Sequence, residues 1–304
     1  MYQTLLVPLD GSKFSERALP IATALAQSLK ARVALVTCLS TSALRSAGAP
    51  DAEFQATGEA QAYLAKLAQT LSEQGLRVET DVVYGEAAEA ILREVDAFSA
   101  DLVVMCTHGR SGLGRWIFGS VAERVLAHSP VPVLLVRPTG EPAALEPEPA
   151  QASILVPLDG SPLSEQALPH ATALARALNS PILLLHSVEP SPLYYNYPLG
   201  VMAQETLDYE QGEARAYLDR VAKQLEREGV ACQTQVLVGW PSDVIAYRGA
   251  APNPRLIVMA THGRSGIARL LMGSVALEVV RRSPLPILLV RPEVDAAKKT
   301  DRAG

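Results

Sequence analysis

The interpretation of the chain depends on the stretch Thr107-His108-Gly109-Arg110-Ser111-Gly112. Nine residues separate Gly109 from the pair Gly119-Ser120, which belongs to the same motif. It comes after the apolar run 102–105 and leads into a helical pattern. The same arrangement recurs at 261–266, with Gly273-Ser274 at the same spacing, after the apolar run 256–259. A strand, a glycine-rich loop and a helix start form an anion site, because small residues admit the ligand and the helix N–H groups point at it. The pattern predicts a nucleotide phosphate chain bound once in each half.

The chain consists of two similar halves. LVPLDGS at 6–12 recurs at 155–161, and SPVPVLLVRP at 129–138 recurs as SPLPILLVRP at 283–292. Two copies at this long spacing indicate a duplicated domain rather than a solenoid. We expect a first domain over 1–138, a linker rich in Pro and Glu over 139–151, a second domain over 152–292 and a polar tail over 293–304.

Composition excludes several classes of protein. The 304 residues suffice for two domains, and 48% hydrophobic residues permit extensive cores. A net charge of −5 offers no basic surface for nucleic acid. There is no spanning apolar run and no signal-peptide pattern at the start. Three scattered cysteines without metal-type spacing fit a reducing compartment. We therefore expect a cytoplasmic protein without a metal site, a nucleic-acid partner or a membrane partner.

Short apolar runs alternate with helical patterns in both halves, which is typical of an α/β fold with a parallel sheet covered on both faces. The pattern predicts two tandem doubly wound sheets of five strands each. The expected strands are 4–9, 32–38, 77–83, 101–105, 131–136, 153–158, 182–187, 231–238, 256–259 and 286–290. The expected helices of the first half are 18–29, 54–74 (stopped by Gly75), 86–98 and 121–128. In the second half, the segment 251–255 carries two prolines, so the helix that begins near Pro241 must be short.

Asp10 and Asp159 each end a first strand and precede Gly-Ser. Ligands of such sheets bind at the carboxyl ends of the strands, where the strand order reverses. If the first and fourth strands are neighbours, the aspartate corner and the glycine loop face one crevice. The carboxylate could accept hydrogen bonds from a ribose or a base, or it could form an Asx turn or a helix cap. Both alternatives stay open.

Other polar residues of the motif also have alternative roles. Ser120 with Glu123 matches a capping box, which the second half lacks because Leu277 stands in the position of Glu123. The Gly-Ser pair therefore recurs without the full box, which favours a ligand over a helix cap. Arg110 and Arg264 could pair with phosphate or lie in solvent.

The sequence gives little support for a catalytic function. His108 and His262 have no carboxylate partner in their own motif, so a structural role is favoured. Ser12 and Ser161 are not in a nucleophile elbow, and no Walker A pattern is present. A redox role for Cys106 would require an exposed thiolate.

The fifth strands, near 131–136 and 286–290, are short and flanked by prolines. A strand at the edge of a sheet has unpaired N–H and C=O groups that need a partner. Two equivalent edges in one chain can pair with each other, which predicts an internal pseudo-dimer.

These residues resemble the universal stress protein family in its tandem two-domain form. The ATP-binding members of that family carry Gly-x2-Gly-x9-Gly-Ser/Thr. This chain matches the later elements at Gly109 and Gly119-Ser120, and again at Gly263 and Gly273-Ser274, but Cys106 and Ala260 replace the first glycine. The resemblance implies a strand order 3-2-1-4-5, pairing through the fifth strands, with a further homodimer as an option, and one ATP per domain, with Mg²⁺ as an optional companion.

The resemblance also implies the binding residues. Asp10 and Asp159 would lie near adenine or ribose, Cys38, Ser187, Met105 and Met259 near adenine, and the Gly and Ser positions at phosphates and ribose. The candidate set in the first domain is Pro8, Asp10, Cys38, Met105, Gly109, Arg110, Gly112, Gly119, Ser120 and Val121. In the second domain it is Pro157, Asp159, Ser187, Met259, Gly263, Arg264, Gly266, Gly273, Ser274 and Val275.

The function that this resemblance implies is an ATP-binding regulatory or stress-protection module with unequal affinity at its two sites. Two alternatives stay open: a slow ATP hydrolase, and a dimerisation scaffold that binds no nucleotide. Hydrolysis is the weaker reading, because the motifs contain neither a positioned general base nor a cluster of acidic metal ligands. No residue is therefore assigned a catalytic role.

Overall fold

The computed structural model describes residues 1–40, 52–107, 119–137, 152–190, 200–251, 253–263 and 272–292. The expected linker 139–151, the tail 293–304 and most of both glycine loops lie outside these ranges. We call residues 1–137 the first half and residues 152–292 the second half.

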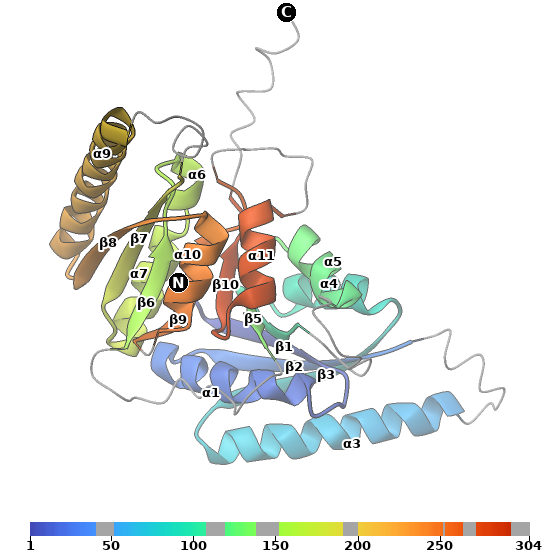
Figure 1. Cartoon of the computed structure of the whole chain (residues 1–304). Coiled ribbons are helices and arrows are strands. Elements are labelled where there is room, and N and C mark those ends of the chain that lie inside the picture. The colour runs from blue at the N-terminus through green and yellow to red at the C-terminus, as the bar shows by residue number, and fades with distance from the viewer. Residues whose placement is uncertain are drawn as a thin grey trace, which may run out of the picture.

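Within the described ranges, ten strands form one continuous sheet of order β3-β2-β1-β4-β5-β10-β9-β6-β7-β8. Each half has the expected order 3-2-1-4-5, and the order of the second half runs in reverse from the centre of the sheet outward (Figure 1). Neighbouring strands are parallel except at β5–β10. The strands are β1 (Thr4–Leu9), β2 (Arg32–Leu39), β3 (Arg77–Tyr84), β4 (Leu102–Cys106), β5 (Val133–Val136), β6 (Ser153–Pro157), β7 (Ile182–Val188), β8 (Cys232–Val238), β9 (Pro254–Ala260) and β10 (Ile287–Val290).

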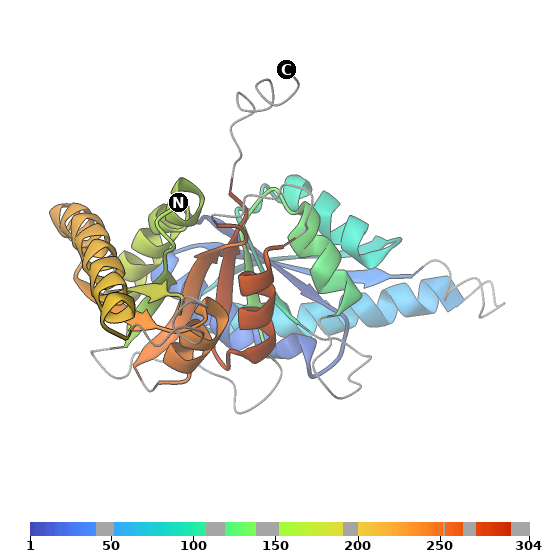
Figure 2. The same ribbon diagram turned by 45° about the horizontal axis from the view of Figure 1, so that its top comes forward.

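Helices cover both faces of this sheet, as the continuous apolar strands require. The helices on one face are α1 (Ala18–Leu29), α3 (Ala52–Glu73), α7 (Leu168–Leu178) and α9 (Gly200–Arg227). Those on the other are α4 (Ala87–Ala97), α5 (Ser120–His128), α10 (Pro241–Gly249) and α11 (Ser274–Arg282). Short turns, η1 (Ser15–Arg17) and α6 (Pro162–Glu165), precede α1 and α7. The long helices α3 and α9 lie at opposite ends of the molecule (Figures 1 and 2).

Local chemistry explains where the elements begin and end. Gly75 has a φ of +85° and follows α3, which confirms the expected stop. β5 begins at Val133, not at Val131, because the Ser129 hydroxyl donates to the Val131 carbonyl (2.7 Å) and accepts from its N–H (3.2 Å). Helix α10 has 9 residues against 11 in α4, as the proline-rich segment behind it predicted.

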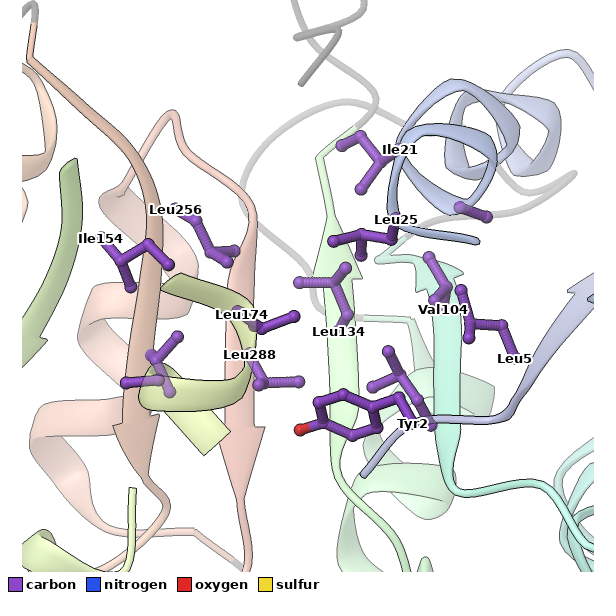
Figure 3. Packing of buried hydrophobic residues seen from close by; sticks show 14 of the residues in the cluster. Tyr2, Leu5, Ile21, Leu25, Val104, Leu134, Ile154, Leu174, Leu256 and Leu288 are labelled. Carbon is purple, nitrogen blue, oxygen red and sulfur yellow. The ribbon is translucent and has the colours of Figure 1, made fainter. Parts of the chain in front are cut away.

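The two halves meet at β5 and β10, which confirms the predicted pairing of the fifth strands. The register pairs Leu134 with Leu288, and both side chains are fully buried. Figure 3 shows these two leucines close together, with Leu174 of the second half and Tyr2 of the first near them, in one apolar cluster that contains residues of both halves. The halves therefore share a core and do not fold around two separate ones.

Tyr2 and His170 form a polar contact across this join, with 2.6 Å between the Tyr2 hydroxyl and His170 Nδ1. Burial lowers the pKa of His170 below its ordinary value. A lowered pKa in the folded state means that protonation of this imidazole opposes folding. Its contribution to stability is therefore complete above pH ~6.5 and is lost as the pH falls through the folded pKa.

We expect His170→Gln to lose part of the fall in stability that wild type shows between pH 7.5 and pH 5. Urea unfolding at several pH values measures this dependence. His128→Gln, which removes an exposed imidazole at the end of α5, should keep the wild-type dependence. Parallel pH curves for His170→Gln and wild type would contradict the assignment.

Candidate functional site

A cavity of about 840 Å³ opens at the carboxyl ends of β6, β7 and β9. This volume lies in the range of small-molecule sites, roughly 300–1,000 Å³. The sheet reverses its strand order between β6 and β9, so the cavity lies where ligands of such sheets bind. All eight of the described second-half candidates line it: Pro157, Asp159, Ser187, Met259, Gly263, Gly273, Ser274 and Val275. Arg264 and Gly266 lie outside the described residues.

Asp159 contacts both the turn after β6 and the glycine loop after β9. Its Oδ1 accepts hydrogen bonds from the Ser161 N–H (2.9 Å) and the Ser161 hydroxyl (2.6 Å). Its Oδ2 would lie 2.1 Å from a Cβ placed on Gly263. The Asx turn is confirmed here, and it recurs where the Ser12 N–H donates to Asp10 (2.9 Å). The glycine is needed because the carboxylate occupies the space of a side chain.

The start of α11 also lines the cavity. Gly273 is the N-cap, its N–H donates to the Thr261 carbonyl (2.8 Å), and Ser274 is the first helical residue. The first half matches, since the Gly119 N–H donates to the Thr107 carbonyl (2.9 Å) ahead of α5. The N-caps are thus Gly119 and Gly273, which have no side chain, and not the serines that follow them. The capping-box interpretation of Ser120 is therefore wrong, and the main-chain N–H groups of the first turn remain suited to an anion.

The first-half candidates occupy the equivalent places at the ends of their elements. Pro8 lies in β1 and Asp10 directly after it, Cys38 lies in β2 and Met105 in β4, and Val121 follows Ser120 in α5. β1 lies between β2 and β4, so these strand ends are adjacent. Gly109, Arg110 and Gly112 lie outside the described residues, as does His108.

Cys38 and Ser187 serve an intramolecular role that sequence reasoning did not anticipate. The Cys38 thiol donates to the Gly85 carbonyl (3.3 Å), and the Ser187 hydroxyl donates to the Gly239 carbonyl (2.7 Å). Both bonds hold the turn that follows an edge strand, β3 or β8.

Helix α9 supplies a wall that the sequence analysis missed. The Tyr217 hydroxyl donates to Glu165 (2.9 Å), and the Arg220 guanidinium lies 5.8 Å from the Tyr217 ring centre. His186 meets the same ring edge-on at 6.1 Å between centroids. Burial raises the pKa of Tyr217, and the hydrogen bond to Glu165 raises it further. The first half has a similar hydrogen bond, from the Tyr63 hydroxyl to Glu16 (3.0 Å), and the sequence could have revealed this repeat. The other α9 residues that line the cavity are Tyr209, Glu210, Glu213 and Ala214.

His262 lines the cavity with its Nδ1 3.0 Å from the Thr261 hydroxyl. Within the described ranges, no group of three or more His, Cys, Asp or Glu residues could hold a metal ion. No helix of those ranges is long and apolar enough to cross a membrane.

Cys106 is buried at the end of β4, and burial raises the pKa of its thiol to about 12. The thiolate that a redox sensor requires is therefore scarce at neutral pH. We expect Ellman's reagent to modify Cys106 in native protein at pH 8 far more slowly than in protein unfolded with guanidinium. Mass spectrometry of the labelled peptides identifies the residue, and rapid labelling of Cys106 in the native state would contradict this expectation.

Comparison with known proteins agrees with the fold and with the repeat. The model of the universal stress protein family matches residues 1–137 and 152–291. A universal stress protein of Mycolicibacterium smegmatis is 30% identical over 224 residues, which cover 72% of this chain and 70% of that protein. One from Methanocaldococcus jannaschii is 31% identical over 138 residues, covering 45% of this chain and 81% of that protein. The crystal structure of a universal stress protein from Archaeoglobus fulgidus has a TM-score of 0.75 at 20% identity and covers 95% of this chain and 98% of that one. The chain therefore belongs to the universal stress protein family, with two of its domains in tandem.

Proposed function

We propose that this protein binds one ATP in each half and acts as a nucleotide-dependent regulatory or stress-protection module. The observation that carries the proposal is the cavity at the ends of β6, β7 and β9. It brings the Asp159 corner, the Gly263 loop and the Gly273-Ser274 helix start together in one space. The aspartate suits a ribose or a base, and the glycine lets the main chain approach the ligand closely. The main-chain N–H groups at the helix start suit a phosphate.

We assign each part of the ATP molecule to residues that line the cavity. The N–H groups at the start of α11 would receive the phosphates, because a helix N-terminus carries partial positive charge. Asp159, Ser187 and Met259 would surround the ribose and adenine. Mg²⁺, where present, would be held chiefly by the phosphates themselves and by water, as is usual for this ion. ATP would supply binding energy to shift conformation or partner choice.

Nucleotide carried through purification tests this proposal. The protein is loaded with excess ATP, passed through gel filtration to remove free nucleotide, and then denatured. The released small molecules are separated by anion-exchange chromatography. We expect adenine nucleotide above the amount recovered from a control without protein. Recovery of none from loaded protein would contradict the proposal. A turnover of ATP that disappears in Asp10→Ala and Asp159→Ala would favour the hydrolase instead.

A further inference from the structure

Two arginines cross the join between the halves in opposite directions. Arg137, directly after β5, donates from Nη1 to the Ser283 carbonyl at the end of α11 (2.8 Å). Arg291, directly after β10, donates from Nη1 to the Ala127 carbonyl in the last turn of α5 (2.8 Å). Each helix that begins at a candidate phosphate site is thus held at its far end by an arginine of the other half.

Each arginine is also adjacent to the ligand loop of its own half. The Thr107 N–H donates to the carbonyl of Val136, the neighbour of Arg137 (3.0 Å). The Thr261 N–H donates to the carbonyl of Val290, the neighbour of Arg291 (2.8 Å). The same two threonines accept from Gly119 and Gly273 through their carbonyls. Two hydrogen bonds and one main-chain link, Val136–Arg137 or Val290–Arg291, therefore connect each loop to the helix of the opposite site.

The physical effect of such a bond is to fix the helix along its axis. The last four carbonyls of a helix lack partners within it, and a cation there also interacts favourably with the helix dipole. Helices α5 and α11 have 9 residues each, so each is a rod of about 14 Å. A displacement of the anchored end moves the N-terminal N–H groups with it, because the helix is too short to bend appreciably.

We propose that Arg137 and Arg291 are positioning residues, each of which sets the phosphate-binding helix of the opposite half. This inference rests on the proposed function, since it assigns the affinity of each ATP site partly to the other half. It differs from a purely structural role of the arginines as links between the halves. A structural link would weaken both sites equally or neither, whereas crossed positioning weakens the distant site selectively.

The test uses the full chain and resolves the two sites separately. ATP is titrated into ¹⁵N-labelled protein, and the amide signals of Gly119 and Gly273 report the first and second site. We expect Arg137→Met to weaken binding about three- to tenfold at Gly273 and less than twofold at Gly119. Arg291→Met should show the reverse. Arg137→Lys, which restores a cationic donor, should recover part of the loss.

Arg176→Met is the matched control, because Arg176 also donates to a main-chain carbonyl, that of Glu228 (2.6 Å), but within the second half only. It should leave both affinities unchanged, and thermal melting checks that each variant is folded. Equal weakening of both sites in Arg137→Met, or a larger effect at Gly119, would overturn the inference.

Spectra recorded without ATP separate this inference from the proposed function. The amide signal of Gly273 should shift in Arg137→Met, and that of Gly119 in Arg291→Met, whether or not ATP binds. If ATP moves neither signal in wild type, the proposed function fails while these shifts still test the positioning. If the ligand-free signals stay at their wild-type positions, the positioning is refuted even when ATP binds.

Discussion

Gly263→Ala lowers the affinity of the second site for ATP at least about tenfold, equivalent to ~1.4 kcal/mol, and leaves the first site unchanged. The reason is steric. A Cβ on Gly263 would lie 2.1 Å from Asp159 Oδ2 and 3.1 Å from its Cγ, so the loop or the carboxylate must move. Asp159 and Gly263 both line the cavity, so a displacement of either residue changes the surface that the ligand contacts. Site-resolved titration with ATP measures the two affinities.

Gly212→Ala is the control for this experiment. Gly212 lies within α9, and a Cβ there meets nothing within 4 Å. This substitution should stabilise the helix by about 0.5–1 kcal/mol and leave both affinities unchanged. Wild-type affinity of the second site in Gly263→Ala would show that the ligand does not depend on the contact between the Asp159 corner and the glycine loop.

Leu288→Ala decreases the free energy of unfolding by about 2–5 kcal/mol. Leu288 is fully buried on β10 and pairs with Leu134 of β5, so truncation leaves a cavity where the two halves meet. Because the cluster around it contains residues of both halves, the loss should be felt in both. Urea unfolding followed by circular dichroism measures the change, and amide hydrogen exchange of β1 and β6 reports each half.

Val238→Ala is the matched control, since Val238 is 46% exposed at the end of an edge strand. Its effect should stay within about 0.5 kcal/mol. A loss below about 1 kcal/mol in Leu288→Ala would contradict the expected cost of the cavity. Faster exchange confined to the second half would show that the halves are independently stable.

Much of the fold could be predicted because its strands are continuous apolar runs and because the chain repeats. Thr4–Leu9 is buried along its whole length, as a strand covered on both faces must be. The pairing of the fifth strands followed from their being equivalent edges. The starts of β5 and β10 could not be predicted from apolar character alone, because the residue two places after Ser129 or Ser283 forms a hydrogen bond with that serine's hydroxyl.

The candidate site was predictable where it depends on strand ends and less so where it depends on distant helices. Parallel strands place their carboxyl ends at one edge, so Asp159 and Gly263 meet although 104 positions separate them. The capping-box alternative for Ser120 is wrong because the pattern does not reveal which residue becomes the N-cap, and here that residue is Gly119. Tyr217 and Arg220 were missed because a periodic helix does not show which of its residues reach past the sheet edge.

Calorimetric titration of the whole chain with ATP tests the central claim most directly. The account predicts two ATP molecules bound per chain, with unequal affinities, and in Gly263→Ala one of these affinities is at least about tenfold lower while the other is unchanged. The absence of binding heat for ATP, ADP and AMP at several temperatures would contradict it.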